Sequence, residues 1–212
     1  MRNGAKLIFD WSGTISNDFD IVFTAINKVF LSYGKQPITR FDIMNLYSSD
    51  AHFLWRFYGL PSKDANEKFL RYLKEGNDPE PIPGAIEIVN KLVQEFPTVI
   101  LTTHPQHLVE REAKRYGLAD CVLVGDVSKV HPCESLERQI EGMDRRKVIY
   151  VGDTAVDIHL ARSYQLLSIA LAHRFGYHNK RILEEAQPQN TINSLEELPL
   201  LVHKILGEAV AN

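Results

Sequence analysis

Residues 7–14 read Leu-Ile-Phe-Asp-Trp-Ser-Gly-Thr, a short apolar run that ends in a carboxylate and a Gly-Thr turn. This pattern predicts a buried strand that leads into a loop. The period then changes, because apolar side chains recur every three or four residues from Phe19 to Tyr33 and stop at Gly34. Such spacing is typical of an amphipathic helix.

The pattern stays helical through residue 76, with a break at residues 59–61. Ser62 is the expected N-cap of a helix that reaches Glu75. The proline-rich segment 77–84 then predicts a linker, because proline fixes its own φ and biases the preceding residue towards extended conformations. No core strand is expected between the first helix and this linker.

After the linker, strand-like and helix-like stretches alternate. The expected strands cover 98–102, 121–124, 147–151 and 167–172, and the expected helices cover 85–96, 106–116, 133–141, 155–164, 179–186 and 195–206. Strands separated by helices are the signature of βαβ units. The predicted fold class is therefore α/β, a doubly wound parallel sheet made by residues 1–16 and 82–212, with a helical cap domain inserted at residues 17–81.

The composition is that of an ordinary globular protein of 212 residues, 44% hydrophobic and 24% charged. A formal net charge of -3 gives no general attraction for nucleic acid or anionic lipid, so neither is expected as a partner. Cys121 and Cys133 are too few for a disulfide scaffold and lack the spacing of a zinc site. With no long apolar segment, we expect a cytoplasmic protein; the sequence gives no indication of oligomeric state.

Polar side chains end the predicted strands. In an open α/β sheet these positions line the ligand crevice. Carboxylates so close together repel unless a cation binds them, and oxygen ligands without His or Cys favour Mg²⁺. A carboxylate after the first strand can attack phosphorus while hydroxyl and ammonium groups hold the transferred oxygens, so the site predicts phosphoryl transfer. The residues are Asp10, Thr102, Thr103, Lys129, Asp153 and Asp157.

Four motifs at these strand ends, in this order, resemble those of the haloacid dehalogenase superfamily. They are Asp10-Trp11-Ser12-Gly13-Thr14, Thr102 after an apolar strand, Lys129-Val130-His131-Pro132, and Gly152-Asp153 with Asp157. The resemblance covers essentially the whole chain, and residues 17–81 are similar to the small helical cap of phosphoglycolate phosphatase-like members. It implies a Mg²⁺-dependent phosphatase that acts on a small phosphorylated metabolite, a phosphate monoester.

The resemblance also implies a role for each motif residue. Asp10 would be the nucleophile, and Thr102 and Lys129 would bind the phosphate. Gly13 and Thr103 would also bind phosphate. Mg²⁺ would be held by Asp10, the backbone carbonyl of Ser12 and Asp153. Asp157 would either bind Mg²⁺ through water or orient Lys129.

Ser12 departs from the family pattern. Most family phosphatases carry a second Asp there, which protonates the leaving oxygen and then activates the attacking water. A serine hydroxyl does not titrate near neutral pH, so Ser12 cannot serve as this acid and base. The role contributes roughly 10²- to 10⁴-fold to the rate. His104 and His131 follow the second and third motifs; we expect solvated loop histidines, with substitution for the missing carboxylate as the open alternative.

Two other functions stay open at this stage. Phosphonoacetaldehyde hydrolases carry the similar motif Asp-Trp-Ala-Gly-Thr but need a cap lysine, and no lysine occurs between Gln36 and Ser62, so Lys35 or Lys63 would have to serve. The other is a catalytically weakened domain that binds a phosphorylated ligand or a protein partner. Arg40 and Arg56, like Lys63, are expected to be surface charges of the insert, with contact to an anionic substrate as the alternative.

Overall fold

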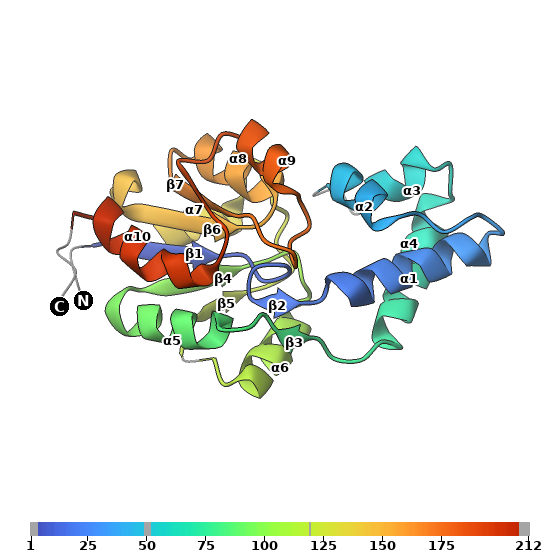
Figure 1. Cartoon of the computed structure of the whole chain (residues 1–212), viewed down its shortest axis with the longest axis horizontal. Helices are drawn as coiled ribbons and strands as arrows, with labels where there is room; N and C mark the ends of the chain where they lie inside the picture. Colours follow the sequence, from blue (N-terminus) through green and yellow to red (C-terminus); the bar gives the residue numbers. More distant parts are fainter. Residues whose placement is uncertain (1–3, 49–51, 119, 208–212) are drawn as a thin grey trace.

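The structure is a computed structural model that describes residues 4–48, 52–118 and 120–207. Its centre is a parallel sheet of six strands in the order β5-β4-β1-β6-β7-β8 (Figure 1). The first strand of the chain therefore lies inside the sheet, and the later strands are added on both sides of it. The strands are β1 (Lys6–Phe9), β4 (Thr98–Leu101), β5 (Val122–Val124), β6 (Val148–Gly152), β7 (Leu167–Leu171) and β8 (Asn190–Ile192).

Alternate residues of β1 serve two separate cores, because successive side chains of a strand point to opposite faces. Leu7 and Phe9 pack into one buried cluster with residues of α5, α6 and α10, whereas Ile8 packs into another with residues of α7 and α8. Helices on both faces confirm the predicted doubly wound α/β class. The helices are α5 (Ala85–Glu95), α6 (Gln106–Tyr116), α7 (Glu134–Ile140), α8 (Ala155–Ser163), α9 (Lys180–Glu185) and α10 (Leu198–Ile205).

The chain between residues 19 and 74 forms a helical cluster with its own hydrophobic core. Phe30, Ile43 and Trp55 are buried in this core, which also includes Tyr177 from the loop after β7. Figure 1 places these helices together beyond the end of β1. The helices are α1 (Phe19–Ser32), α2 (Arg40–Leu46), α3 (Phe53–Phe57) and α4 (Ser62–Lys74).

A short ribbon joins this cluster to the sheet. Strands β2 (Ser16–Asn17) and β3 (Glu80–Pro81) pair antiparallel, with Ser16 opposite Pro81. We expected only a linker at residues 77–84, so β3 corrects that prediction. Ser62 is also corrected: Pro61 occupies the N-cap position, and the Ser62 hydroxyl lies 2.8 Å from His52 Nδ1.

In the part of the chain that the structure describes, no helix combines the length and the apolar character needed to cross a membrane.

Candidate active site

The centre of the site is an ion-paired trio of buried side chains beyond the end of β1. Lys129, from the loop after β5, places its Nζ 2.6 Å from Asp10 Oδ1 and 2.7 Å from Asp157 Oδ1. Burial alone would lower the pKa of Lys129, but the carboxylates of Asp10 and Asp157 raise it well above its usual value. Lys129 is therefore a fixed cation beside Asp10.

Three carboxylates share this site, since Asp10, Asp153 and Asp157 each offer an oxygen within 4.8 Å of the others. Burial raises the pKa of Asp10 to about 7, and burial together with the neighbouring carboxylates raises that of Asp153 well above its usual range. One ammonium against three carboxylates leaves an excess of negative charge in a dry environment. Carboxylate oxygens with such an excess fit a hard divalent cation such as Mg²⁺.

Asp153 is held by the first motif and by the loop after β7. Thr14 donates its hydroxyl proton to Asp153 Oδ1 at 2.9 Å, and the Tyr177 amide donates to Oδ2 at 2.7 Å. Gly13 approaches so closely that a Cβ on it would lie 2.3 Å from Oδ2, and its φ of +72° also favours glycine. Gly13 therefore shapes the pocket for Asp153.

The backbone of Gly13 is already hydrogen-bonded. Its amide donates to the Ser16 carbonyl at 2.9 Å, and its own carbonyl accepts from His173 Nε2 at 2.7 Å. The amide of Gly13 thus closes the turn of the first motif, and the expected binding of phosphate by Gly13 stays a prediction. Close approach to Asp153 is what requires glycine here.

Both oxygens of Asp157 are occupied by protein donors. Oδ1 accepts from Lys129 and Tyr150, and Oδ2 accepts from the Thr154 hydroxyl at 2.5 Å and the Thr154 amide at 3.2 Å. The Thr154 contacts form the capping box at the start of α8. Of the two roles implied for Asp157, this geometry supports the orientation of Lys129.

The two threonines after β4 differ in exposure. Thr102 is buried, and its Oγ1 accepts the His104 amide at 3.1 Å, which leaves the hydroxyl proton to donate to a ligand. Thr103 is exposed and lines the pocket described below. The structure thus brings all the expected strand-end residues to one edge of the sheet.

A second group of buried polar side chains surrounds Ser12, and the sequence analysis missed it. Asp18 Oδ1 accepts the Tyr177 hydroxyl at 3.1 Å, and the nearby Ser12 side chain opposes the rise in the Asp18 pKa. Asp18 is 4% exposed, and burial raises the pKa of its carboxyl. Asp18 follows the motif by only a few residues, but its burial depends on Tyr177, far away in the sequence.

His104 belongs to the same group, which corrects the expectation of a solvated loop histidine. Its Nε2 lies 3.4 Å from Glu112 Oε1, and Glu112 Oε2 accepts the Trp11 indole proton at 2.8 Å. Burial alone would lower the pKa of His104, but Glu112 and Asp18 raise it above its usual value overall. His131, in contrast, is exposed as expected.

One signal in the sequence could have indicated Glu112. It lies on the apolar stripe of α6, three residues after buried Val109 and next to buried Ala113. A carboxylate in that position must be buried with a partner. The partners, Trp11 and His104, come from two other strand ends.

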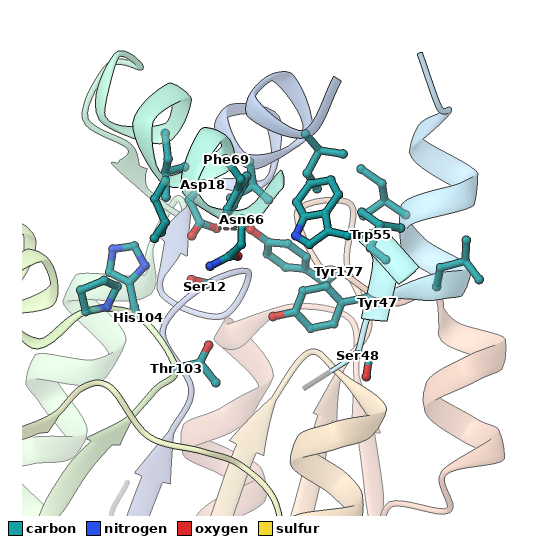
Figure 2. Close-up of a pocket in the computed structure, with 18 residues that line it drawn as sticks. Ser12, Asp18, Tyr47, Ser48, Trp55, Asn66, Phe69, Thr103, His104 and Tyr177 are labelled. Carbon is teal, nitrogen blue, oxygen red and sulfur yellow. Dashed lines mark hydrogen bonds between the residues drawn. The ribbon is translucent and has the colours of Figure 1, made fainter. Parts of the chain in front are cut away.

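A pocket of about 290 Å³ opens beside Ser12, between the sheet edge and the helical cluster. In Figure 2, Ser12, Thr103 and His104 lie on one side of it, and Trp55 and Phe69 lie on the other. None of the described lining residues is Lys or Arg.

The cap cations lie elsewhere. Lys35 and Lys63 are exposed and do not line the pocket, so no described lysine there fits the Schiff-base alternative. Arg40 pairs with Asp20 and covers the Phe19 ring, with its guanidinium carbon 4.0 Å from the ring centre. This placement agrees with the expected surface role of Arg40.

The buried cluster of carboxylates and Lys129 lies where the strand order of the doubly wound sheet reverses. This arrangement defines an enzyme with a carboxylate-centred site on a Rossmann-like core. The family model described as haloacid dehalogenase-like hydrolase matches residues 7–171. The chain belongs to this family and is a hydrolase.

The individual relatives have low sequence identity to this chain. The chain is 24% identical to a phosphoglycolate phosphatase from Synechococcus elongatus, over 95% of this chain and 99% of that protein. A haloacid dehalogenase-like family hydrolase from Streptococcus pneumoniae shares the fold at a TM-score of 0.80 and 17% identity, over 95% of this chain and 99% of that one. A hydrolase from Pseudomonas syringae gives a TM-score of 0.74 at 19% identity, over 93% and 97% of the two chains.

Proposed function

We propose that the protein is a Mg²⁺-dependent phosphatase that acts on a small phosphate monoester through an aspartyl-phosphate on Asp10. The observation that carries the proposal is the Asp10 carboxylate, buried at the central strand end and held 2.6 Å from the Lys129 ammonium. The similarity to the phosphoglycolate phosphatase supports the same reaction class.

In the first step an Asp10 oxygen attacks phosphorus, and the bond between phosphorus and the ester oxygen breaks, with its electron pair leaving on the alcohol oxygen. Thr102 and Lys129 hold the phosphoryl oxygens by a hydroxyl and an ammonium. In the second step water attacks the same phosphorus, releases inorganic phosphate and restores the Asp10 carboxylate. Asp157 positions Lys129 throughout.

The proposed ligands of Mg²⁺ are Asp10, Asp153 and the backbone carbonyl of Ser12. When bound, the ion supplies positive charge that offsets repulsion between the carboxylates and the substrate phosphate. Thr14 and the Tyr177 amide keep Asp153 facing Asp10.

His104 is the proposed proton carrier in place of the carboxylate that Ser12 lacks. It lines the pocket together with Ser12, and Glu112 and Asp18 favour its protonated form. An imidazolium can protonate the leaving alcohol, and the resulting imidazole can then accept a proton from the attacking water. His131 is exposed and does not line the pocket.

Residues 17–81 are proposed to act as a cap over the site, with residues 1–16 and 82–212 as the core. Tyr47, at the end of α2, supports this division because its hydroxyl points towards the side of the pocket where Ser12 and Thr103 lie (Figure 2). Burial raises the pKa of Tyr47, and so do the carboxylates of Asp10 and Asp153. The cap therefore places a hydroxyl close to the charged centre.

The reaction and its ion are tested together by phosphate release from a panel of phosphate monoesters, with Mg²⁺ and with EDTA. We expect release only with Mg²⁺. Mg²⁺ should also raise the melting temperature, since a ligand at a hundred times its Kd stabilises the folded state by about 2.7 kcal/mol. Asp153→Asn should lose most of this shift, whereas Asp20→Asn, at an exposed carboxylate, should keep it. Release undiminished by EDTA would contradict the proposed ion.

Closure of the cap is tested by small-angle scattering with and without orthovanadate. We expect a smaller radius of gyration with the phosphate analogue, because closure of the α1–α4 cluster over the site would make the molecule more compact. In the structure the cluster contacts the core through Tyr177, whose ring centre is 4.9 Å from that of Phe19 and 4.7 Å from that of Tyr47. Tyr177→Ala should enlarge the ligand-free particle. An identical radius in all samples would contradict a mobile lid.

A further inference from the structure

The cap side of the pocket is mostly apolar, with Tyr47, Ser48 and Asn66 as its polar residues. The pocket also includes Ser12, Thr103 and His104, which follow β1 and β4, so the organic group of an ester bound at Asp10 would enter it. The apolar side chains come from α1, α2, α3 and α4, and they include Val22, Ile43, Leu54, Trp55, Phe69 and Leu73. Apolar walls favour an apolar ligand because burial of both surfaces removes them from water.

The charges near the pocket disfavour an anionic organic group. None of the described lining residues is Lys or Arg, and the only described cationic candidate on the lining is His104, which already faces Glu112. Asp18 lines the pocket and is buried. A substrate carboxylate would therefore be desolvated near carboxylates with no cation of its own.

Trp55 carries an independent indication of a ligand. Its indole nitrogen is buried and has no hydrogen-bond partner in the described part of the chain, although a buried donor normally has one. Figure 2 shows this nitrogen on the side of the ring that faces the middle of the pocket. A group that fills the pocket would meet this N–H donor, which the π face of an aromatic ring or a neutral oxygen can accept and a purely aliphatic group cannot.

The size of the pocket sets the size of this group. A cavity of about 150 Å³ accommodates benzene, and this pocket measures about 290 Å³. We propose that the pocket selects phosphate monoesters whose organic group is uncharged, mainly apolar and at least as large as an aromatic ring, over small acidic esters such as phosphoglycolate. This inference rests on the proposed phosphatase activity and names its substrate class.

The test compares benzyl phosphate with phosphoglycolate. Both esters release an alcohol from a CH₂ group, so they differ mainly in carrying a ring or a carboxylate. One methylene in an apolar site changes kcat/KM by about 10- to 200-fold, so we expect kcat/KM for benzyl phosphate to be at least about 100-fold higher. Phosphoglycolate hydrolysed as well as or better than benzyl phosphate would overturn the inference and leave the phosphatase proposal intact.

Phe69→Ala should lower kcat/KM for benzyl phosphate about tenfold or more, and should leave the low value for phosphoglycolate nearly unchanged. The matched control is Phe57→Ala, at a ring that is 59% exposed and does not line the pocket, and it should behave like the unaltered enzyme. Equal losses on both substrates in Phe69→Ala, with the fold intact by circular dichroism, would contradict the inference.

A binding experiment tests the pocket assignment independently of the phosphatase reaction. Benzylphosphonate and phosphonoacetate are non-hydrolysable analogues of the two esters, and thermal shift with the unaltered protein needs no turnover. We expect a larger shift with benzylphosphonate. If it binds preferentially while no ester is hydrolysed, the pocket assignment holds and the phosphatase proposal fails; preferential binding of phosphonoacetate overturns the pocket assignment.

Discussion

Asp10→Asn should reduce phosphate release by at least about 10⁴-fold, a loss typical of removing a catalytic nucleophile. An amide oxygen does not attack phosphorus as a carboxylate does, so neither step of the proposed reaction can proceed. The fold should persist, because Lys129 keeps its contact with Asp157 and the excess negative charge of the site becomes smaller. Phosphate release and circular dichroism are the two measurements.

The control for Asp10→Asn is Asp20→Asn, which removes an exposed carboxylate paired with Arg40 and should leave turnover unchanged. The covalent intermediate is a further readout, since brief mixing with labelled substrate should mark the unaltered protein but not the Asp10 variant. Unchanged turnover in Asp10→Asn would contradict the mechanism. An unaltered protein that binds phosphate and Mg²⁺ but hydrolyses no ester would instead favour the weakened-domain alternative.

His104→Gln should lower turnover of alkyl phosphates by roughly 10²- to 10⁴-fold, the usual contribution of general acid-base catalysis. Formation of the aspartyl-phosphate from 4-nitrophenyl phosphate should slow less, because nitrophenolate leaves without a proton. Hydrolysis of the aspartyl-phosphate should become slow for both substrates, so the phosphorylated enzyme should accumulate. The matched control is His131→Gln, at an exposed ring outside the pocket.

The pH dependence follows from the charges that face His104. Glu112 on α6, Asp18 before α1 and Asp10 after β1 raise the pKa of its imidazole. Proton donation to alkoxide leaving groups should therefore persist above the usual histidine range and decline as the pH rises through the raised pKa. The contribution of this imidazolium to stability has the same sign: it is fully present below the unfolded pKa and is lost as the pH rises through the folded one.

A rescue experiment distinguishes a proton carrier from a structural residue. Ser12→Asp restores the carboxylate that most family phosphatases carry, and in the His104→Gln background it should recover turnover of alkyl phosphates. A purely structural defect at His104 would not be recovered by a carboxylate on another loop. Full activity in His104→Gln would show that the proton travels by another route.

The sequence was sufficient for the core of the fold because its strands alternate with strongly amphipathic helices. The helix at 106–116 ends as expected at Gly117, which adopts the left-handed conformation that glycine tolerates. Strand β8 was missed because Asn190-Thr191-Ile192 is short and polar. The β2–β3 ribbon was missed because each half has two residues, and their pairing depends on chain segments more than sixty residues apart.

In the candidate site too, local sequence patterns indicated some residues and not others. Asp10, Thr102, Lys129 and Asp153 were predicted to lie together because each follows a predicted strand, and parallel strands end at one edge of the sheet. Asp18, in contrast, was not singled out, because no local pattern in the sequence indicates that it is buried. Its burial depends on Tyr177, and no local pattern connects two residues so far apart.

The β2–β3 ribbon lets the inserted helices vary independently of the sheet. The insert leaves the core at Ser16 and returns at Pro81, and these residues are paired neighbours. A segment whose two ends meet in this way can change in length and sequence without altering the spacing of the strands on either side. Evolution or protein engineering could therefore exchange the helices to which we assign specificity as a unit, while the proposed phosphate chemistry stays with the strand ends.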